Sequence, residues 1–276
     1  MGMRRFAAGL GIAFALFVAR PASADEPTAD IAKHMVEVRK SATSAQVAAA
    51  LRNVKPEGDQ DLAAALEAKN GDTPGAKAAL ETAHALRALA KIGTTPAARE
   101  VVKIAGDANG AYRPEAARVL KAMGDPAMPA LIEAKKDPSF ELRRWSTAQL
   151  EAMGKRLPGD AVQTKDNDVL ADVLHAYGAV HDLDAVPVIL SFVSSDRVQV
   201  RTAAREATIA FGQDAVWKLR EAYANVAGKP AQEGWTAEQT AKELFAAHDK
   251  LRLQEVYGLL DEGLAKQKDG HLDEAI

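Results

Sequence analysis

The fold is decided by the stretch Arg143-Arg-Trp-Ser-Thr-Ala-Gln-Leu-Glu-Ala-Met-Gly154, because its plan occurs three times in the chain. The same plan recurs from Arg113 to Gly124 and from Arg201 to Gly212. In each copy an Arg opens an amphipathic stretch and a Gly follows eleven residues later. The closing glycines Gly93, Gly124 and Gly154 are spaced 31 and 30 residues apart. A helical period near 30 residues predicts a stack of similar helix pairs in place of one globular core.

The apolar residues of each copy line one face of a helix. Ala116, Leu120 and Met123 lie at i, i+4 and i+7 in the first copy, and similar stripes recur in the other two. One helix pair cannot bury such a stripe alone, so neighbouring pairs must cover it. We therefore expect an all-α fold, an α-solenoid of stacked antiparallel helix pairs, in which each closing Gly supplies the positive φ that lets the chain reverse.

The composition excludes several classes of protein. The chain has 276 residues, of which 47 % are hydrophobic and only 5 % aromatic, and its net charge is −3. This charge gives no basic field for nucleic acid, so we expect no nucleic-acid partner. Because there is no Cys, disulfides, thiol nucleophiles and Cys-ligated metal sites are excluded.

The first 24 residues have the pattern of a signal peptide. Arg4 and Arg5 precede the apolar run Phe6 to Ala19, and Ala22-Ser23-Ala24 is a typical cleavage site. The run is short for a membrane span, although a short membrane anchor is the alternative. We expect an exported protein, periplasmic or secreted in a bacterium, with no stable membrane insertion after cleavage.

The remaining chain divides into three parts. Residues 25–71 hold short amphipathic patterns and are expected to form an N-terminal helical cap. Residues 72–229 carry the repeated helix pairs. Residues 230–276 begin with a Pro- and Gly-containing linker and continue as C-terminal helices.

The repeats resemble the HEAT repeat family in its short bacterial form. That form has a Pro in the first helix, an Asp in the turn, an Arg six residues later, and small and aliphatic residues that end in Gly. Pro96, Pro129 and Pro187 match the first-helix Pro. The resemblance covers about residues 72–228, while the unit that closes near His181 has neither the Arg nor the Gly.

The resemblance implies a structural role for the recurring polar positions of the pattern. In HEAT proteins the Asp and Arg of neighbouring units form a hydrogen-bonded ladder, in which an Arg offers five donors to carboxylate and carbonyl acceptors between helices. The alternative is an anion-binding stripe. The residues expected in the ladder are Asp107, Arg113, Asp137, Arg143, Asp196 and Arg201.

The C-terminal end resembles the start of a tetratricopeptide repeat. Gly263, Ala265, Gly270 and Ala275 hold small-residue positions of that pattern, whereas Glu262 and Lys266 depart from it. A plain helical hairpin is the alternative. We expect that the natural chain continues beyond Ile276 with further repeats.

No catalytic pattern stands out in the sequence. It contains no G-x-S-x-G elbow, P-loop or G-x-G-x-x-G, and no His-Glu dipeptide of the kind that HEAT-like di-iron hydroxylases use. We expect no catalytic, cofactor-binding or metal-binding residues and no cofactor. The aromatic residues Trp145, Tyr177, Phe192, Phe211 and Trp217 are expected to pack in the core.

These features favour a non-enzymatic scaffold that holds a protein or peptide partner on its second helices. A HEAT-like enzyme or accessory subunit, lyase-like or metal-dependent, and an envelope-assembly component docking through its tetratricopeptide part are the alternatives. The oligomeric state stays open. The candidate partner-binding residues are Arg118, Lys121, Arg144, Gln149, Glu151, Arg205 and Trp235.

Overall fold

A computed structural model describes residues 26–268, and every regular element among them is a helix. The expected all-α class is confirmed. The expected signal peptide, residues 1–24, lies outside the described residues. The α-helices are α1 Glu26–Ser41, α2 Ser44–Leu51, α3 Leu62–Glu67, α4 Pro74–Ile92, α5 Thr95–Gly106, α6 Arg113–Met123, α7 Met128–Glu133, α8 Phe140–Ala152, α9 Pro158–Ala161, α10 Asn167–Val180, α11 Val186–Leu190, α12 Val198–Ala210, α13 Val216–Ala227 and α14 Ala237–Lys268. The 3₁₀ turns are η1 Ala108–Gly110, η2 Asp125–Ala127, η3 Ala134–Lys136, η4 Leu183–Ala185 and η5 Gly212–Ala215.

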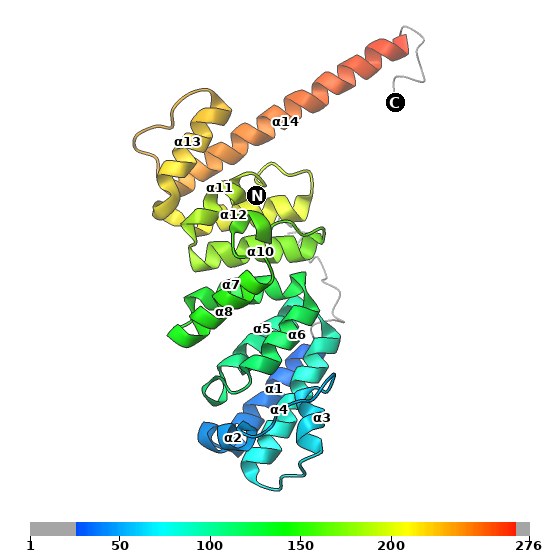
Figure 1. Ribbon diagram of the computed structural model, residues 1–276. Coiled ribbons are helices and arrows are strands. Elements are labelled where there is room, and N and C mark those ends of the chain that lie inside the picture. Colours follow the sequence, from blue (N-terminus) through cyan, green and yellow to red (C-terminus); the bar gives the residue numbers. More distant parts are fainter. Residues whose placement is uncertain (1–25, 269–276) are drawn as a thin grey trace, which may run out of the picture.

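The helices form an elongated stack (Figure 1). At one end α1, α2 and α3 all pack on α4, and α5 then packs on α4, α6 and α7. Further along, α10 packs on both α7 and α12, and α13 pairs with α14 at the other end. The second helix α8 packs on α7 and η3. Because α10 packs on α7 as well, α8 lies at the side of the stack (Figure 1).

The closing glycines adopt the backbone conformation that their spacing predicts. Gly93, Gly124 and Gly154 have φ values of +67°, +68° and +68°. In the unit that lacks a Gly, His181 takes the left-handed position with φ +56° and ends α10. A non-Gly residue costs about 1–2 kcal/mol there. The turn geometry is therefore kept even where the glycine is missing.

The core lies between the helices and is rich in Ala and Leu. Tyr177 and Phe211 are fully buried, and Trp145 and Phe192 are partly buried against the core. The expectation for Trp217 is wrong, because 60 % of this residue is exposed. Trp217 lies in the first turn of α13, and Lys218 stands 5.2 Å from its ring centroid, so its ring faces outward.

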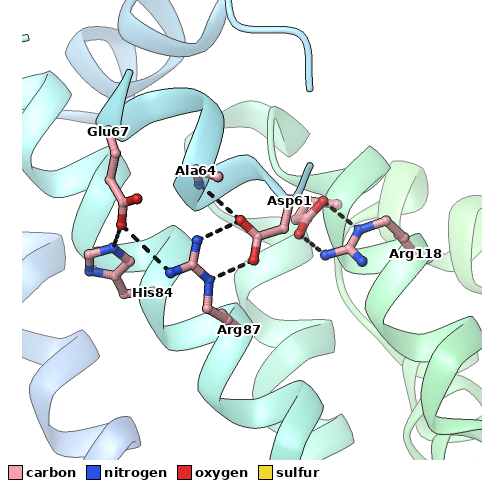
Figure 2. A network of polar contacts seen from close by, with 7 residues as sticks. Asp61, Ala64, Glu67, His84, Arg87 and Arg118 are labelled. Atoms are coloured by element: carbon pink, nitrogen blue, oxygen red, sulfur yellow. Dashed lines mark hydrogen bonds and ion pairs between the residues drawn. The ribbon is translucent and has the colours of Figure 1, made fainter. Parts of the chain in front are cut away.

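Polar contacts fasten α3 to the stack (Figure 2). Asp61, the N-cap of α3, accepts a hydrogen bond from the Ala64 N–H at 2.9 Å and two from the Arg87 guanidinium at 2.6 and 2.7 Å. The Arg87 bonds hold the pKa of Asp61 down at about 2. Glu67 contacts His84 at 2.7 Å and Arg87 at 3.6 Å. These contacts join α3 to α4 along the whole length of the short helix.

The C-terminal part is a hairpin with one long arm. Residues 228–236 connect α13 to α14, a continuous helix of 32 residues. Gly263 and Ala265, two residues of the expected tetratricopeptide pattern, lie inside this one helix. Gly270 and Ala275, on which the tetratricopeptide pattern also rests, lie outside the described residues.

A glycine permits a close approach between α10 and α12. A Cβ added to Gly178 would lie 2.9 Å from the Ala207 Cα and 3.1 Å from its Cβ. A glycine inside a helix lowers the free energy of unfolding by about 0.5–1 kcal/mol relative to Ala. The presence of Gly178 in α10 is explained by the close approach to Ala207, which leaves no room for a Cβ.

We predict that Gly178→Ala lowers the free energy of unfolding by about 1–2 kcal/mol, because overpacking outweighs the gain in helix propensity. Urea denaturation followed by circular dichroism measures the change. The control is Gly258→Ala in α14, where an added Cβ meets no atom within 4 Å. That variant should be as stable as the parent or up to about 1 kcal/mol more stable. A Gly178→Ala protein at least as stable as the parent would contradict the prediction.

Candidate functional site

Two of the repeat arginines bind the turn that precedes their own helix. The Arg143 Nη1 donates to the carbonyl oxygens of Asp137 at 2.6 Å and Pro138 at 2.9 Å. The Arg201 Nη1 donates to the carbonyl oxygen of Ser195 at 2.5 Å. In both cases an acceptor lies six residues before the Arg. This geometry explains the six-residue spacing, and Ser195 is the structural counterpart of Asp137.

The side-chain ladder expected from the resemblance has other partners here. Asp107 accepts from the Arg39 Nε at 2.8 Å, and Asp196 pairs with Arg252 at 2.9 Å, so both bind arginines outside the repeat pattern. Arg113 lies 3.9 Å from Glu141 in the following unit. Among the described residues no Asp side chain of the six ladder residues therefore pairs with an Arg side chain of that set. Arg143 and Arg201 each direct Nη1 to backbone carbonyls of the preceding turn in place of a carboxylate.

We predict that Arg143→Ala lowers the free energy of unfolding by about 1–3 kcal/mol, because the variant loses two hydrogen bonds from a charged donor to carbonyls of a turn. Thermal denaturation reads out the loss. Arg144→Ala is the matched control, since Arg144 is exposed and makes no hydrogen bond or ion pair among the described residues. Equal melting temperatures for the two variants would refute a structural role for Arg143.

The outer face of α8 forms an open groove. Phe140, Arg144, Thr147, Ala148 and Glu151 are spaced i, i+4, i+7, i+8 and i+11, which places them on one helical face. They line a groove of about 460 Å³ together with Lys135 and Arg143. The opposite face of α8 is buried through Leu142, Ser146 and Leu150. The helix is thus fixed to the stack by one side and presents the other.

The groove combines positive charge with an exposed aromatic ring. Phe140 is 62 % exposed, and the Arg143 guanidinium carbon lies 5.7 Å from its ring centroid. Lys135 pairs with Asp182 at 2.5 Å, and Glu151 pairs with Arg156 at 3.3 Å. Arg144 is the groove cation without a hydrogen-bond or ion-pair partner in the described chain. Such a surface suits a ligand with a carboxylate next to an apolar side chain.

The structure does not bring the seven predicted partner-binding residues together. Arg144 and Glu151 lie in the groove. Arg118, on α6, is held by Glu115 at 2.5 Å, and Lys121 is exposed on the same helix. Gln149 is half-buried and lies outside the groove, on another side of α8.

The other two predicted residues hold the C-terminal hairpin in place. The Arg205 guanidinium donates to the Asp249 carboxylate at 2.5 and 3.0 Å and lies 5.1 Å from the Phe245 ring. Trp235 packs against the core and meets the Tyr223 ring edge-on at 5.2 Å. Arg205 therefore fastens α14 to α12, and Trp235 fastens the connecting loop to α13.

The sequence prediction missed Phe140, Lys135 and Thr147. Phe140 and Thr147 share the 3.6-residue period of Arg144 and Glu151, so the helical face could have been extended to them from the sequence. Lys135 belongs to the preceding turn η3, and its place at the groove depends on how that turn packs.

A second pocket, of about 160 Å³, lies between α1, α2, α4 and η1. Asp107 lines it, and burial raises the pKa of its carboxyl against the opposing effect of Arg39. The Tyr112 hydroxyl is buried here without a hydrogen bond of good geometry, although Thr82 lies near enough to influence its pKa, which burial raises to about 12. This pocket lies among the helices of the N-terminal end, and the Arg39–Asp107 pair forms part of its wall.

Between Glu26 and Lys268 no cluster of three or more His, Asp or Glu side chains is placed to hold a metal ion. Within the same range no helix has both the length and the apolar character that a membrane span needs.

A family model of HEAT repeats matches residues 79–151, a segment that runs from α4 into α8 and includes every residue that lines the groove. The predicted resemblance is confirmed for this segment. No curated protein and no solved structure matches the chain.

Proposed function

We propose that the protein is a non-enzymatic scaffold that binds an acidic segment of a protein or peptide partner in the groove of α8. One observation carries the proposal: the exposed ring of Phe140 and the unpaired cation Arg144 line the same groove. Both residues belong to α8, whose opposite face is packed against the stack. HEAT repeats commonly mediate contacts between proteins, and the matched segment contains this groove.

The chemistry of the groove defines the partner. Arg144 can bind a carboxylate through two parallel N–H groups, and Phe140 offers an apolar surface next to it. An extended or helical segment with Asp or Glu beside Leu, Ile or Phe fits both features. Because Arg143 is held by the turn carbonyls, it supports the aromatic ring and leaves recognition of the carboxylate to Arg144.

A peptide-display selection on the purified chain, followed by fluorescence anisotropy with the selected peptides, tests the proposal. We expect sequences enriched in Asp or Glu next to an apolar residue. Arg144→Glu should weaken their binding at least about tenfold, because a charge-assisted hydrogen bond contributes about 1.5–3 kcal/mol. The matched control is Lys121→Glu, an exposed cation on α6 outside the groove, which should bind normally.

Two results would reject the groove as the binding site. The first is a selection without acidic enrichment. The second is an Arg144→Glu variant that keeps the parental melting temperature and binds the selected peptides as tightly as the parent.

We also propose that the scaffold acts outside the cytoplasm, in the periplasm or after secretion. The support is the basic, apolar and small-residue pattern of residues 1–24. Expression in a bacterium with cell fractionation and N-terminal sequencing tests this. We expect a mature chain that begins at Asp25 in the periplasm or medium, and an uncleaved cytoplasmic chain would disprove it.

A further inference from the structure

The last half of α14 extends beyond the stack, and no other helix of the described chain packs along it (Figure 1). Its base is pinned by Asp249, bound to Arg205, and by Arg252, bound to Asp196. Beyond Arg252 every described residue of the helix is exposed except Gly263, which is half-buried. Residues 253–268 thus form a bare helix about 24 Å long.

The bare helix carries an apolar seam. Leu253, Tyr257, Leu260 and Leu264 are 55 %, 62 %, 54 % and 45 % exposed. Their spacings of four, three and four residues are those of a coiled-coil seam. Isolated helices of this length are marginal in water, since most helical stability in proteins comes from packing of an apolar face. A partner helix on this seam would supply that packing.

The seam continues onto the body of the molecule. Extended toward the N-terminus with the same spacing, the seam includes Lys250 and then Ala246. Both line a groove of about 450 Å³ between α13 and α14, with Tyr223, Val226 and Leu251. A helix laid along the seam would therefore end in a preformed hollow beside α13.

The charges along the seam favour a second copy of the same helix in antiparallel orientation. One antiparallel register places Tyr257 opposite Leu253 of the second copy and Leu264 opposite Ala246 of that copy. In this register Lys250 lies beside Asp261 of the second copy. In the same register Glu243 comes beside Lys268 of the second copy, and two-fold symmetry doubles both ion pairs. A parallel pairing would instead bring Lys250 against Lys250 and Glu243 against Glu243, which is repulsive.

We propose that two copies of this chain form an antiparallel, two-fold symmetric dimer through α14, with the end of each helix lying in the α13–α14 groove of the other. This contact is separate from the α8 groove. Each copy brings the same apolar seam and both members of each ion pair, so the surface is complementary to itself.

Sedimentation velocity of the purified chain over a range of concentrations tests the dimer. We expect a species of twice the chain mass that dissociates on dilution. Leu253→Glu should leave a monomer at concentrations where the parent is a dimer. The matched control is Leu259→Glu, since Leu259 is also exposed, at 67 %, but lies off the seam, and this variant should remain a dimer.

Charge reversal tests the register. Lys250→Glu and Asp261→Lys should each raise the dissociation constant of the dimer roughly tenfold. The double variant should recover the parental dissociation constant. Its carboxylate at position 250 would again lie beside an opposite charge, the ammonium group at position 261. Circular dichroism establishes that each variant is folded.

Three outcomes would overturn the proposal: a parent chain that is monomeric at all concentrations, equal behaviour of the Leu253→Glu and Leu259→Glu variants, or a double charge reversal without recovery.

Discussion

The apolar face of each hairpin in this protein is covered by the next hairpin, and every other feature depends on that contact. Where α10 meets α12, the backbones approach so closely that only Gly178 fits opposite Ala207. Ala203 and Ala204, on the same helix as Ala207, are also small and buried. Because helix faces are matched in shape over successive units, the stack is rigid enough to present a surface. A consequence of this arrangement is that both ends of the stack need a cover.

The helices and their turns were predictable from the sequence because their signals are local. The glycine at the end of a helix, the Pro at its start and the 3.6-residue period of apolar side chains all act within a few residues. Arg143 shows where this reasoning stops. Its spacing from Asp137 was visible, and the pattern indicated carboxylate or carbonyl acceptors in a neighbouring unit, whereas in the structure Arg143 donates to backbone carbonyls of the turn before its own helix.

The candidate site depended on long-range packing that no local signal specifies. The second helix α8 packs on α7, and α10 then packs on α7 as well, so the outer face of α8 stays open. Two of the seven predicted residues, Arg144 and Glu151, lie on this face because they share its helical period. Arg205 was predicted as a surface binding residue, yet it binds Asp249 of α14, which lies 44 residues further along the chain. Trp235 was predicted as an exposed or inter-domain anchor, and in the structure it packs against Tyr223 of the preceding helix α13.

The turn-binding arginines have a consequence for how such a chain can change over time. A guanidinium that donates to a backbone carbonyl oxygen does not depend on the side chain of the residue that it binds. Asp137 in one hairpin and Ser195 in another therefore accept this hydrogen bond equally well. Successive hairpins can accordingly drift apart in sequence at these turns while their architecture persists. Such divergence makes the repeats difficult to detect from the sequence although their backbone geometry stays similar.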